Sequence, residues 1–151
     1  MTPDRTDLAL LRALMADGSL TAKEAGAAAG VTQPVAWRRI RRMEEAGVIR
    51  GRRVALDRAK LGYEVVVFLG VKLAAKGRSR VEEFERAVTA IPEVQLVQYV
   101  LGVYDYRLKV VARDLPDFER ILRRRIMTLP GIGEVESNVL LSEEKAAAAP
   151  F

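Results

Sequence analysis

Histidine and cysteine are both absent from this chain of 151 residues. Because protein zinc sites are built mainly from these two residue types, their absence leaves no plausible zinc site. The missing histidine also removes the commonest general acid–base group, and the missing cysteine removes disulfides and thiol catalysis. We therefore expect no metal, no cofactor and no catalytic residues, in a protein of a reducing compartment.

Long apolar runs are lacking too. The apolar stretch over residues 65–75 falls well short of the roughly 20 residues that a membrane helix needs. We also expect no signal peptide before the first helix. We expect a cytoplasmic protein with no membrane partner.

Charge is plentiful but unevenly placed. The chain has 25 Lys and Arg against 20 Asp and Glu, for a net charge of +5. Residues 1–56 hold ten basic against six acidic side chains, whereas residues 57–151 hold fifteen against fourteen. The basic excess belongs to the N-terminal third, as expected of a module that binds nucleic acid.

The stretch from Thr32 to Val54 predicts a DNA-facing helix followed by a short basic hairpin. Thr32 is a suitable N-cap and Pro34 suits the first turn, so the helix should begin at Gln33. At about 100° per residue, one arc of this helix is apolar and the opposite arc is exposed. The apolar arc holds Ala36, Ile40 and Met43, and the exposed arc holds Pro34, Arg38, Arg41, Arg42 and Glu45.

Beyond this helix, Gly47 is the expected C′ residue, and Val48 should begin a strand that continues through Arg53. Seven arginines lie between Arg38 and Arg53, and their alternative role is a merely solvated face. Arg39, on the helix flank, suits either a phosphate contact or an ion pair. Trp37 lies beside the apolar arc, which favours partial burial over base stacking.

Two shorter segments upstream complete the pattern. Helical spacing predicts a first helix over residues 7–15, and the capping box Thr21 with Glu24 starts an alanine-rich second helix that ends at residue 28 or 29. A turn at 29–31 then leads to Gln33. Two short helices joined by a glycine-containing turn form the helix-turn-helix layout, in which the second helix enters the major groove through its N-terminal residues.

We assign eight residues to contacts with double-stranded DNA. Gln33, Pro34 and Arg38 lie where side chains reach base edges, whereas Arg42, Arg52 and Arg53 are placed for backbone phosphates. The full predicted set is Thr32, Gln33, Pro34, Arg38, Arg41, Arg42, Arg52 and Arg53.

After residue 56 the pattern changes, and residues 57–63 predict a compact linker. The run over 65–75 predicts a central strand that is buried on both faces. Spacing and alternation predict helices over 81–91 and from Asp114 or Asp117 to Leu129, and further strands over 94–101, 106–112 and 134–141. This order matches a ferredoxin-like βαββαβ domain over residues 64–143, which makes the chain α+β. Residues 144–151 should form a flexible tail.

In such a domain both helices cover one face of the sheet and leave the other bare. An exposed apolar sheet face is most simply buried by a second copy of the chain, so we expect a homodimer with this face as its core. The two helix-turn-helix domains of the dimer would read a two-fold DNA site.

Four stretches, WRRIRRMEEAGVIRG, LDRAKLGY, GVYDYRLKV and LPGIGEVES, carry a resemblance to the Lrp/AsnC family of transcription regulators. The resemblance runs from Asp7 to about Glu143. It implies an N-terminal DNA-binding domain and a C-terminal domain that oligomerises and senses amino acids. It also implies dimers that assemble further, often to octamers, with ligand held where dimers meet.

The resemblance also implies an effector site. The glycine-x-x-aspartate turn of the family maps onto Gly102 and Asp105, and we add Tyr104 and Ser137 as effector-binding residues. Leu101 and Val135 stand where the family often has threonine, so we expect an apolar effector such as leucine or phenylalanine. The alternatives are that Gly102 and Asp105 are ordinary turn residues and that Tyr99, Tyr104 and Tyr106 pack at an interface.

The sequence therefore favours a sequence-specific, nucleoid-associated transcription regulator. A non-specific nucleoid-packing protein differs from it only in specificity. An enzyme on the same architecture is the other alternative, because proteins similar to this family include decarboxylases of a modified haem. Those enzymes are expected to use histidine, which this chain lacks.

Overall fold

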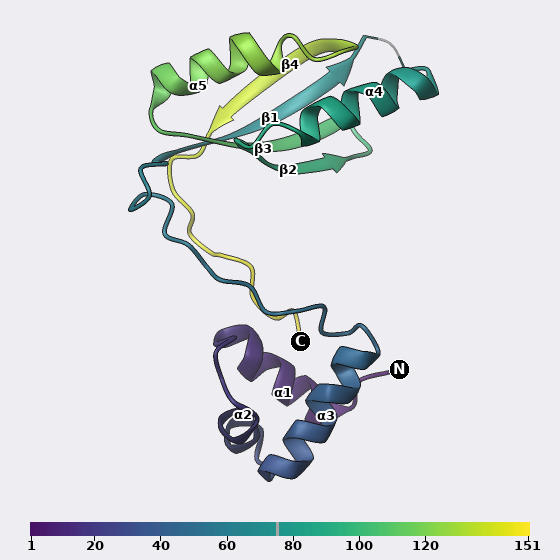
Figure 1. The fold of residues 1–151 in the computed structure, drawn as a ribbon, viewed down its shortest axis with the longest axis vertical. Helices are drawn as coiled ribbons and strands as arrows, with labels where there is room; N and C mark the ends of the chain where they lie inside the picture. The colour runs from purple at the N-terminus through teal and green to yellow at the C-terminus, as the bar shows by residue number, and fades with distance from the viewer. Residues whose placement is uncertain (75) are drawn as a thin grey trace. The chain divides into compact units, whose positions relative to one another are not determined.

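The computed structural model describes residues 1–74 and 76–151, so Ala75, at the end of the predicted first strand, lies outside the described residues. The chain forms two compact units, one of Met1–Ala55 with Glu144–Phe151 and one of Leu56–Glu143 (Figure 1). The C-terminal segment thus groups with the N-terminal unit. The Arg12 Nε donates to the main-chain oxygen of Phe151 over 2.7 Å, and its guanidinium lies 5.9 Å from the centroid of that ring. Residues 144–151 contain no helix or strand and these two contacts involve Phe151 alone, so the flexibility of the tail stays a prediction.

The N-terminal unit contains α1 (Arg5–Ala16), α2 (Ala22–Ala29) and α3 (Gln33–Glu45). Helix α1 begins before the predicted start because Asp4 and Asp7 form a capping box. The predicted box of Thr21 and Glu24 is present at α2. The core of this unit consists of Leu10, Ala25, Ala36, Ile40 and Met43, which confirms the predicted apolar arc of α3.

Two predictions around α3 are wrong. The helix begins at Gln33 as expected, but the Thr32 hydroxyl makes no capping hydrogen bond. Residues 48–54 contain no strand, so the predicted basic hairpin is not formed. The physical reason is that a hairpin needs a returning strand, whereas residues 58–62 form a turn instead. Arg52 Nη1 donates to the main-chain oxygens of Gly18 (3.1 Å) and Leu20 (2.9 Å) and so ties this segment to the α1–α2 turn.

The second unit contains β1 (Val65–Leu73), α4 (Arg78–Thr89), β2 (Val94–Tyr99), β3 (Tyr106–Ala112), α5 (Leu115–Ile121), the π-helix η1 (Leu122–Ile126) and β4 (Ile132–Val139). The strands form one antiparallel sheet in the order β2-β3-β1-β4. This confirms the predicted ferredoxin-like order with β1 inside the sheet. Strand β4 begins two residues earlier than expected because Ile132 pairs with Leu73.

Helices α4 and α5 cover one face of this sheet (Figure 1). Phe84 of α4 and Ile121 of α5 pack in one core with Val67, Leu69 and Leu108 of the strands. The apolar spacing of the helices and the alternation of the strands therefore meet on this face.

The opposite, bare face is more polar than the sequence predicts. Strand β1 is not buried on both sides in the single chain, because Phe68 and Gly70 stay partly exposed. Directly opposed residues of an antiparallel pair share a face, so the register places Lys109 beside Phe68 and Arg107 beside Gly70. The Arg107 guanidinium lies 5.6 Å from the Phe68 ring centroid. The bare face thus combines an aromatic ring with two cations.

Candidate functional site

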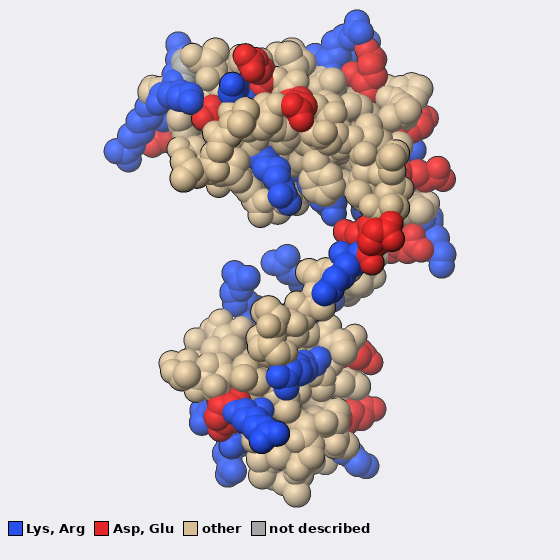
Figure 2. Space-filling model, turned by 180° about the vertical axis from the view of Figure 1, so that it is seen from behind, with Lys and Arg blue, Asp and Glu red and all other residues tan. Residues whose placement is uncertain are grey.

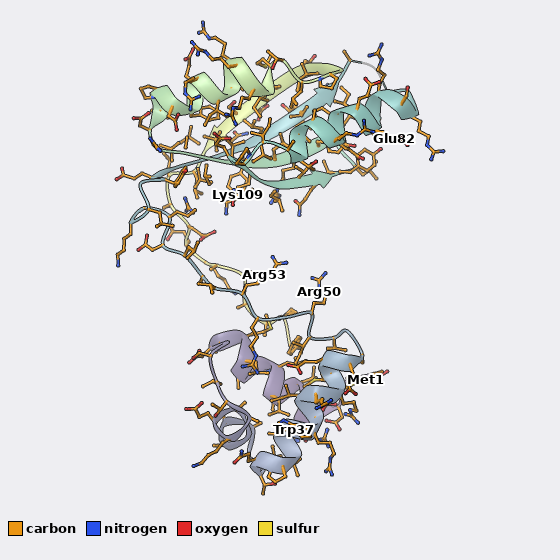
Figure 3. All side chains as sticks on the ribbon, in the orientation of Figure 1. Met1, Trp37, Arg50, Arg53, Glu82 and Lys109 are labelled. Carbon is orange, nitrogen blue, oxygen red and sulfur yellow. The ribbon has the colours of Figure 1, made fainter. Side chains whose placement is uncertain are left out.

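Helix α3 exposes the residues predicted to meet DNA. Gln33, Pro34, Arg38 and Arg41 are all exposed, as is the preceding Thr32. Lys and Arg side chains project from the face of the unit seen in Figure 2. Figure 3 labels Trp37 on α3, and Arg50 and Arg53 on the segment that follows it. The structure therefore brings the predicted base-reading residues together on one helical surface.

A buried aspartate holds this helix against α1. Asp7 is fully buried and accepts hydrogen bonds from Arg39 Nη1 and Arg42 Nη2, each over 2.9 Å. Arg39 Nη1 also donates to Asp4 over 2.7 Å, and this hydrogen bond is the largest cause that holds the pKa of Asp4 below its ordinary value. The same bond raises the pKa of Arg39. We call Asp7 with Arg39 and Arg42 the Asp7 latch.

The latch changes the roles expected of two arginines. Arg39 forms ion pairs, which decides between its two predicted roles within the unit. Arg42, which we predict to bind DNA phosphates, donates one hydrogen bond to Asp7 through Nη2, and its side chain stays 54% exposed. The signal that sequence reasoning missed is that Asp7 lies three residues before the buried Leu10, on the core side of α1. A carboxylate on a buried helical face requires cationic partners.

The remaining arginines divide into two groups. Arg41 Nε pairs with Glu45 Oε1 over 2.9 Å, and Arg52 donates to main-chain oxygens as described above. Within the described chain, Arg38 and Arg53 make no hydrogen bond or ion pair to the protein and are exposed. Arg38 on α3 and Arg53 after it are therefore the arginines of the predicted set whose guanidinium groups are fully available to a ligand.

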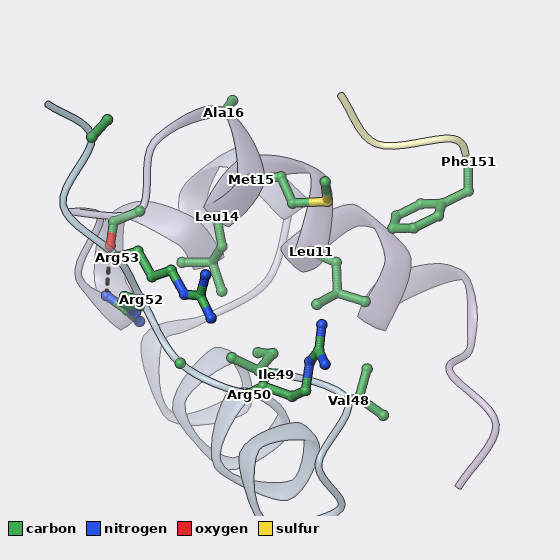
Figure 4. Close-up of a pocket in the computed structure, with 13 residues that line it drawn as sticks. Leu11, Leu14, Met15, Ala16, Val48, Ile49, Arg50, Arg52, Arg53 and Phe151 are labelled. Carbon is green, nitrogen blue, oxygen red and sulfur yellow. Dashed lines mark hydrogen bonds between the residues drawn. The ribbon is translucent and has the colours of Figure 1, made fainter. Parts of the chain in front are cut away.

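The arginines after α3 line a cavity of about 710 Å³ in the same unit (Figure 4). Its apolar wall includes Leu11, Leu14 and Ile49, and Arg50 and Arg53 lie beside it. The aliphatic stems of long cationic side chains commonly cover such apolar surface while the charged group stays in water. This arrangement leaves the guanidinium of Arg53 at the surface.

In the C-terminal unit, Asp105 closes the end of β1. Its main-chain nitrogen donates to the Val71 oxygen over 2.9 Å, and its carboxylate accepts from the Leu73 nitrogen (2.9 Å) and from Lys76 Nζ (3.0 Å). The Leu73 hydrogen bond, followed by that of Lys76, lowers the pKa of Asp105. In this structure Asp105 therefore binds main-chain atoms as a turn residue does, and it also forms a partly exposed ion pair with Lys76.

Tyr104 lies on the bare face of the sheet. A Cβ atom placed on Gly70 would lie 2.6 Å from Tyr104 Cδ2, so glycine is required for this close approach. The Tyr104 hydroxyl donates to Glu136, which raises the pKa of Tyr104 and lowers that of Glu136. Among the described residues, apart from Gly102 and its two chain neighbours, no heavy atom lies within 4 Å of the Cβ position of Gly102.

The predicted effector residues do not form one cluster. Gly102 and Tyr104 line a cavity of about 240 Å³ with Phe68, whereas Asp105 lines one of about 210 Å³ with Lys76. Ser137 pairs with Leu69, whose side chain lies in the core under the helices, and it lines neither cavity.

The second cavity contains residues that sequence reasoning missed. Buried Tyr106 donates its hydroxyl to Glu85 Oε1 over 2.5 Å, and burial followed by this bond raises the pKa of Tyr106. Lys76 lies 29 positions from its partner Asp105, and Glu85 lies 21 positions from its partner Tyr106. No local spacing pattern therefore predicts these contacts. They give the cavity one cation and one anion besides Asp105.

Within the described residues, no helix is long and apolar enough to cross a membrane, and no group of three or more acidic side chains is arranged to hold a metal ion.

Comparisons with known proteins support both units. A model described as winged helix-turn-helix DNA-binding matches residues 3–50, and a model described as Lrp/AsnC ligand binding domain matches residues 66–150. The first match ends before residues 51–54, where the structure has no wing strand.

Named relatives span nearly the whole chain. The chain is 32% identical to the proline dehydrogenase transcriptional activator of Rhizobium radiobacter, covering 94% of this chain and 91% of that one. It is 31% identical to the Bkd operon transcriptional regulator of Pseudomonas aeruginosa, covering 97% and 96%. These names describe transcriptional regulators, which confirms the prediction of a regulator and not an enzyme.

Solved structures share the fold. A transcriptional regulator of Neisseria meningitidis in complex with L-Met matches with a TM-score of 0.91 at 26% identity, covering 96% of this chain and 94% of that one. E. coli AsnC matches with a TM-score of 0.86 at 26% identity, covering 99% of each chain. The chain therefore belongs to the Lrp/AsnC family of transcriptional regulators.

Proposed function

We propose that this family member binds a two-fold DNA site as a homodimer or higher oligomer and responds to an apolar amino acid. The observation that carries the DNA-binding part is the surface of α3, where Arg38 is exposed and unpaired within the described chain while the Asp7 latch holds the helix from behind. A rigid helix with an uncommitted guanidinium suits bidentate reading of a guanine edge.

The predicted DNA contacts divide by their availability. Gln33, Pro34 and Arg38 meet base edges, and Arg53 meets a phosphate. Thr32 makes no capping bond, so its hydroxyl can donate to a phosphate as well. Arg41, Arg42 and Arg52 keep their intramolecular bonds and add phosphate contacts through their remaining N–H groups. Because the basic charge lies near the α3 surface, affinity should fall with salt.

Assembly follows from the bare face of the sheet. Phe68 lies on this face and is only partly buried in the single chain, and a second copy would cover it. Lys109 and Arg107, whose guanidinium already lies over Phe68, are on the same face, and Glu136 of a second copy would give them an acidic partner. Such a dimer places two α3 helices for a two-fold operator, and we propose further assembly up to octamers.

The effector part rests on the cavity at Asp105 and on the relative solved with L-Met. An amino acid brings an ammonium and a carboxylate. In this proposal the ammonium replaces Lys76 at the Asp105 carboxylate, and the freed Lys76 binds the ligand carboxylate. Gly102 leaves the backbone accessible from the neighbouring cavity, and Tyr104 completes that wall. Ser137 lines neither cavity and would take part only through a neighbouring chain.

Selection of bound DNA from a random pool tests the function. We expect a two-fold motif whose half-sites lie about one helical turn apart. Recovery of bound DNA with no shared motif would favour the non-specific nucleoid-packing alternative. A regulator that binds this motif would work at the nucleoid in the cytoplasm.

A further inference from the structure

The only tryptophan of the chain is exposed on α3. Trp37 keeps 54% of its surface exposed, whereas Ala36 and Ile40 on the same helix are buried. This differs from the partial burial that its place beside the apolar arc predicts. The core of the unit is complete without the indole, so packing does not account for this side chain. Large aromatic side chains that stay exposed among charges are typical of binding surfaces.

The position of Trp37 is that of a groove-facing residue. It is the fifth residue of α3, in the N-terminal half that enters the major groove. At about 100° per residue it lies about 60° from Pro34 around the helix, and Arg41 lies between the two, about 40° from Trp37. Trp37 therefore belongs to the same exposed surface as the residues assigned to base edges.

The neighbours of Trp37 are arranged to place apolar and cationic groups together. The Arg41 guanidinium lies 5.3 Å from the centroid of the ring, and Glu45 holds Arg41 from the next turn. A shallow cavity of about 340 Å³ lies beside the ring, with Leu20 and Ile40 in its apolar wall and Arg52 at its edge. An apolar group next to a phosphate is the ligand that this combination fits.

We propose that Trp37 is a specificity-determining residue that contacts the 5-methyl group of a thymine in the major groove. The thymine methyl is the apolar group that base pairs present there, and it lies within reach of phosphates on the same strand. Trp37 covers the methyl while Arg41, steadied by the ring and by Glu45, donates to a phosphate. The inference rests on the proposed DNA-binding function and adds a base preference to it.

The test uses the full chain and the motif recovered by selection. Each thymine of the motif is replaced in turn by deoxyuracil, which removes only the methyl group. For the wild type we expect one position in each half-site at which binding weakens about fourfold, the value for one buried methyl group. In Trp37→Ala that position should become insensitive, and Trp37→Phe should retain part of the effect.

Met15→Ala is the matched control, because Met15 is 53% exposed in the same unit but lies on α1. It should keep the wild-type sensitivity to deoxyuracil. A second readout needs no variant: since Trp37 is the only tryptophan, its emission should change on binding of the motif.

Three results would overturn the inference and leave the regulator intact. They are an unchanged emission on motif binding, an equal deoxyuracil profile in wild type and Trp37→Ala, and a changed oligomeric state of Trp37→Ala, which would assign the ring to a protein interface. Failure of the proposed function is different, because selection would then recover no motif at all.

Discussion

Each of the two units contains one aspartate that organises its local contacts, and the two aspartates do so in opposite ways. Asp7 is fully buried and binds two arginines of α3, whereas the Asp105 side chain is 19% exposed and binds one main-chain nitrogen and one lysine. Removing a cation from a buried carboxylate leaves a charge without solvent, so the first pairing is fixed. A partly exposed ion pair is worth little and can exchange partners. We therefore expect the Asp7 pairing to keep α3 in place, whereas the Asp105–Lys76 pair can open to admit the proposed ligand.

The largest effect should come from breaking the Asp7 latch. Asp7→Ala removes two ion pairs and the capping box of α1, and we expect a loss of about 2–3 kcal/mol in the unfolding free energy of the N-terminal unit. This is less than for a fully buried pair, because Arg39 and Arg42 regain water. Urea unfolding followed by Trp37 emission reports this unit alone.

Glu45→Ala is the control for that experiment. It breaks the Arg41–Glu45 pair, whose two side chains are 60% and 67% exposed, and should change stability by less than about 0.5 kcal/mol. An equal loss of unfolding free energy in the two variants would contradict a larger contribution of the Asp7 latch to the stability of the unit.

The corresponding change in the second unit is Gly70→Ala. The added Cβ would lie 2.6 Å from the Tyr104 ring, so the ring must move, at a cost of about 1–3 kcal/mol. All tyrosines lie in this unit, at positions 63, 99, 104 and 106, so tyrosine absorbance reports its unfolding. Gly102→Ala, with open space at its Cβ position, should have little effect. Destabilisation of similar size by both would contradict the close approach of Tyr104 to β1.

On DNA, two arginines should differ in kind. Arg38→Ala should cost about 1–3 kcal/mol on the selected motif and relax the preference at one base. Arg53→Ala should weaken binding to all DNA sequences alike. It should also reduce the slope of log affinity against log salt concentration by about one. Uniform losses in both variants would remove Arg38 from base reading.

The smallest expected effect concerns Asp105. Asp105→Asn should cost about 1 kcal/mol in the stability of its unit, since the Leu73 nitrogen keeps an acceptor and Lys76 loses its partner. The folded-state pKa of Asp105 is lowered, so its stabilisation is complete above its unfolded pKa of about 4 and is lost as pH falls through the lowered pKa. The difference between wild type and variant should therefore vanish in acid. A difference that persists at low pH would mean that the charge is not what matters.

The same aspartate decides the effector proposal. Calorimetric titration with the twenty amino acids should give heat with an apolar one for wild type and none for Asp105→Ala. Lys76→Met should weaken binding too, because the ligand carboxylate loses its cation. Equal heat from all three proteins would leave Asp105 as a turn residue and the C-terminal unit as an assembly device.

Local periodicity was sufficient for most of the fold. The spacing of Ala36, Ile40 and Met43 defined the buried arc of α3, and the capping box of Thr21 and Glu24 marked the start of α2. The order of strands and helices after residue 64 followed from alternation and helical spacing. These signals are reliable because each depends on residues within one or two turns of the chain.

The site was less predictable, because its decisive contacts join distant residues. Arg39 and Arg42 bind Asp7 across 32 and 35 positions of the chain. Arg39 is thereby mostly buried in ion pairs, whereas Arg42 uses one nitrogen for Asp7 and stays exposed. The expected strand after Val48 failed for a similar reason: its β-branched residues favoured a strand, but no second strand lies beside it. The angle of Trp37 on the helix predicts packing, whereas the small core of the unit closes without the indole.

By itself, the sequence determined the two-unit plan, the basic DNA-facing helix and the family, since hydrophobic spacing, caps and charge are written in neighbouring residues. Which arginines are free, which face of β1 is covered and which groups bind Asp105 became clear from the three-dimensional contacts alone. The reason is that an ion pair or a buried face depends on which elements pack together, and no short window of the chain contains both partners.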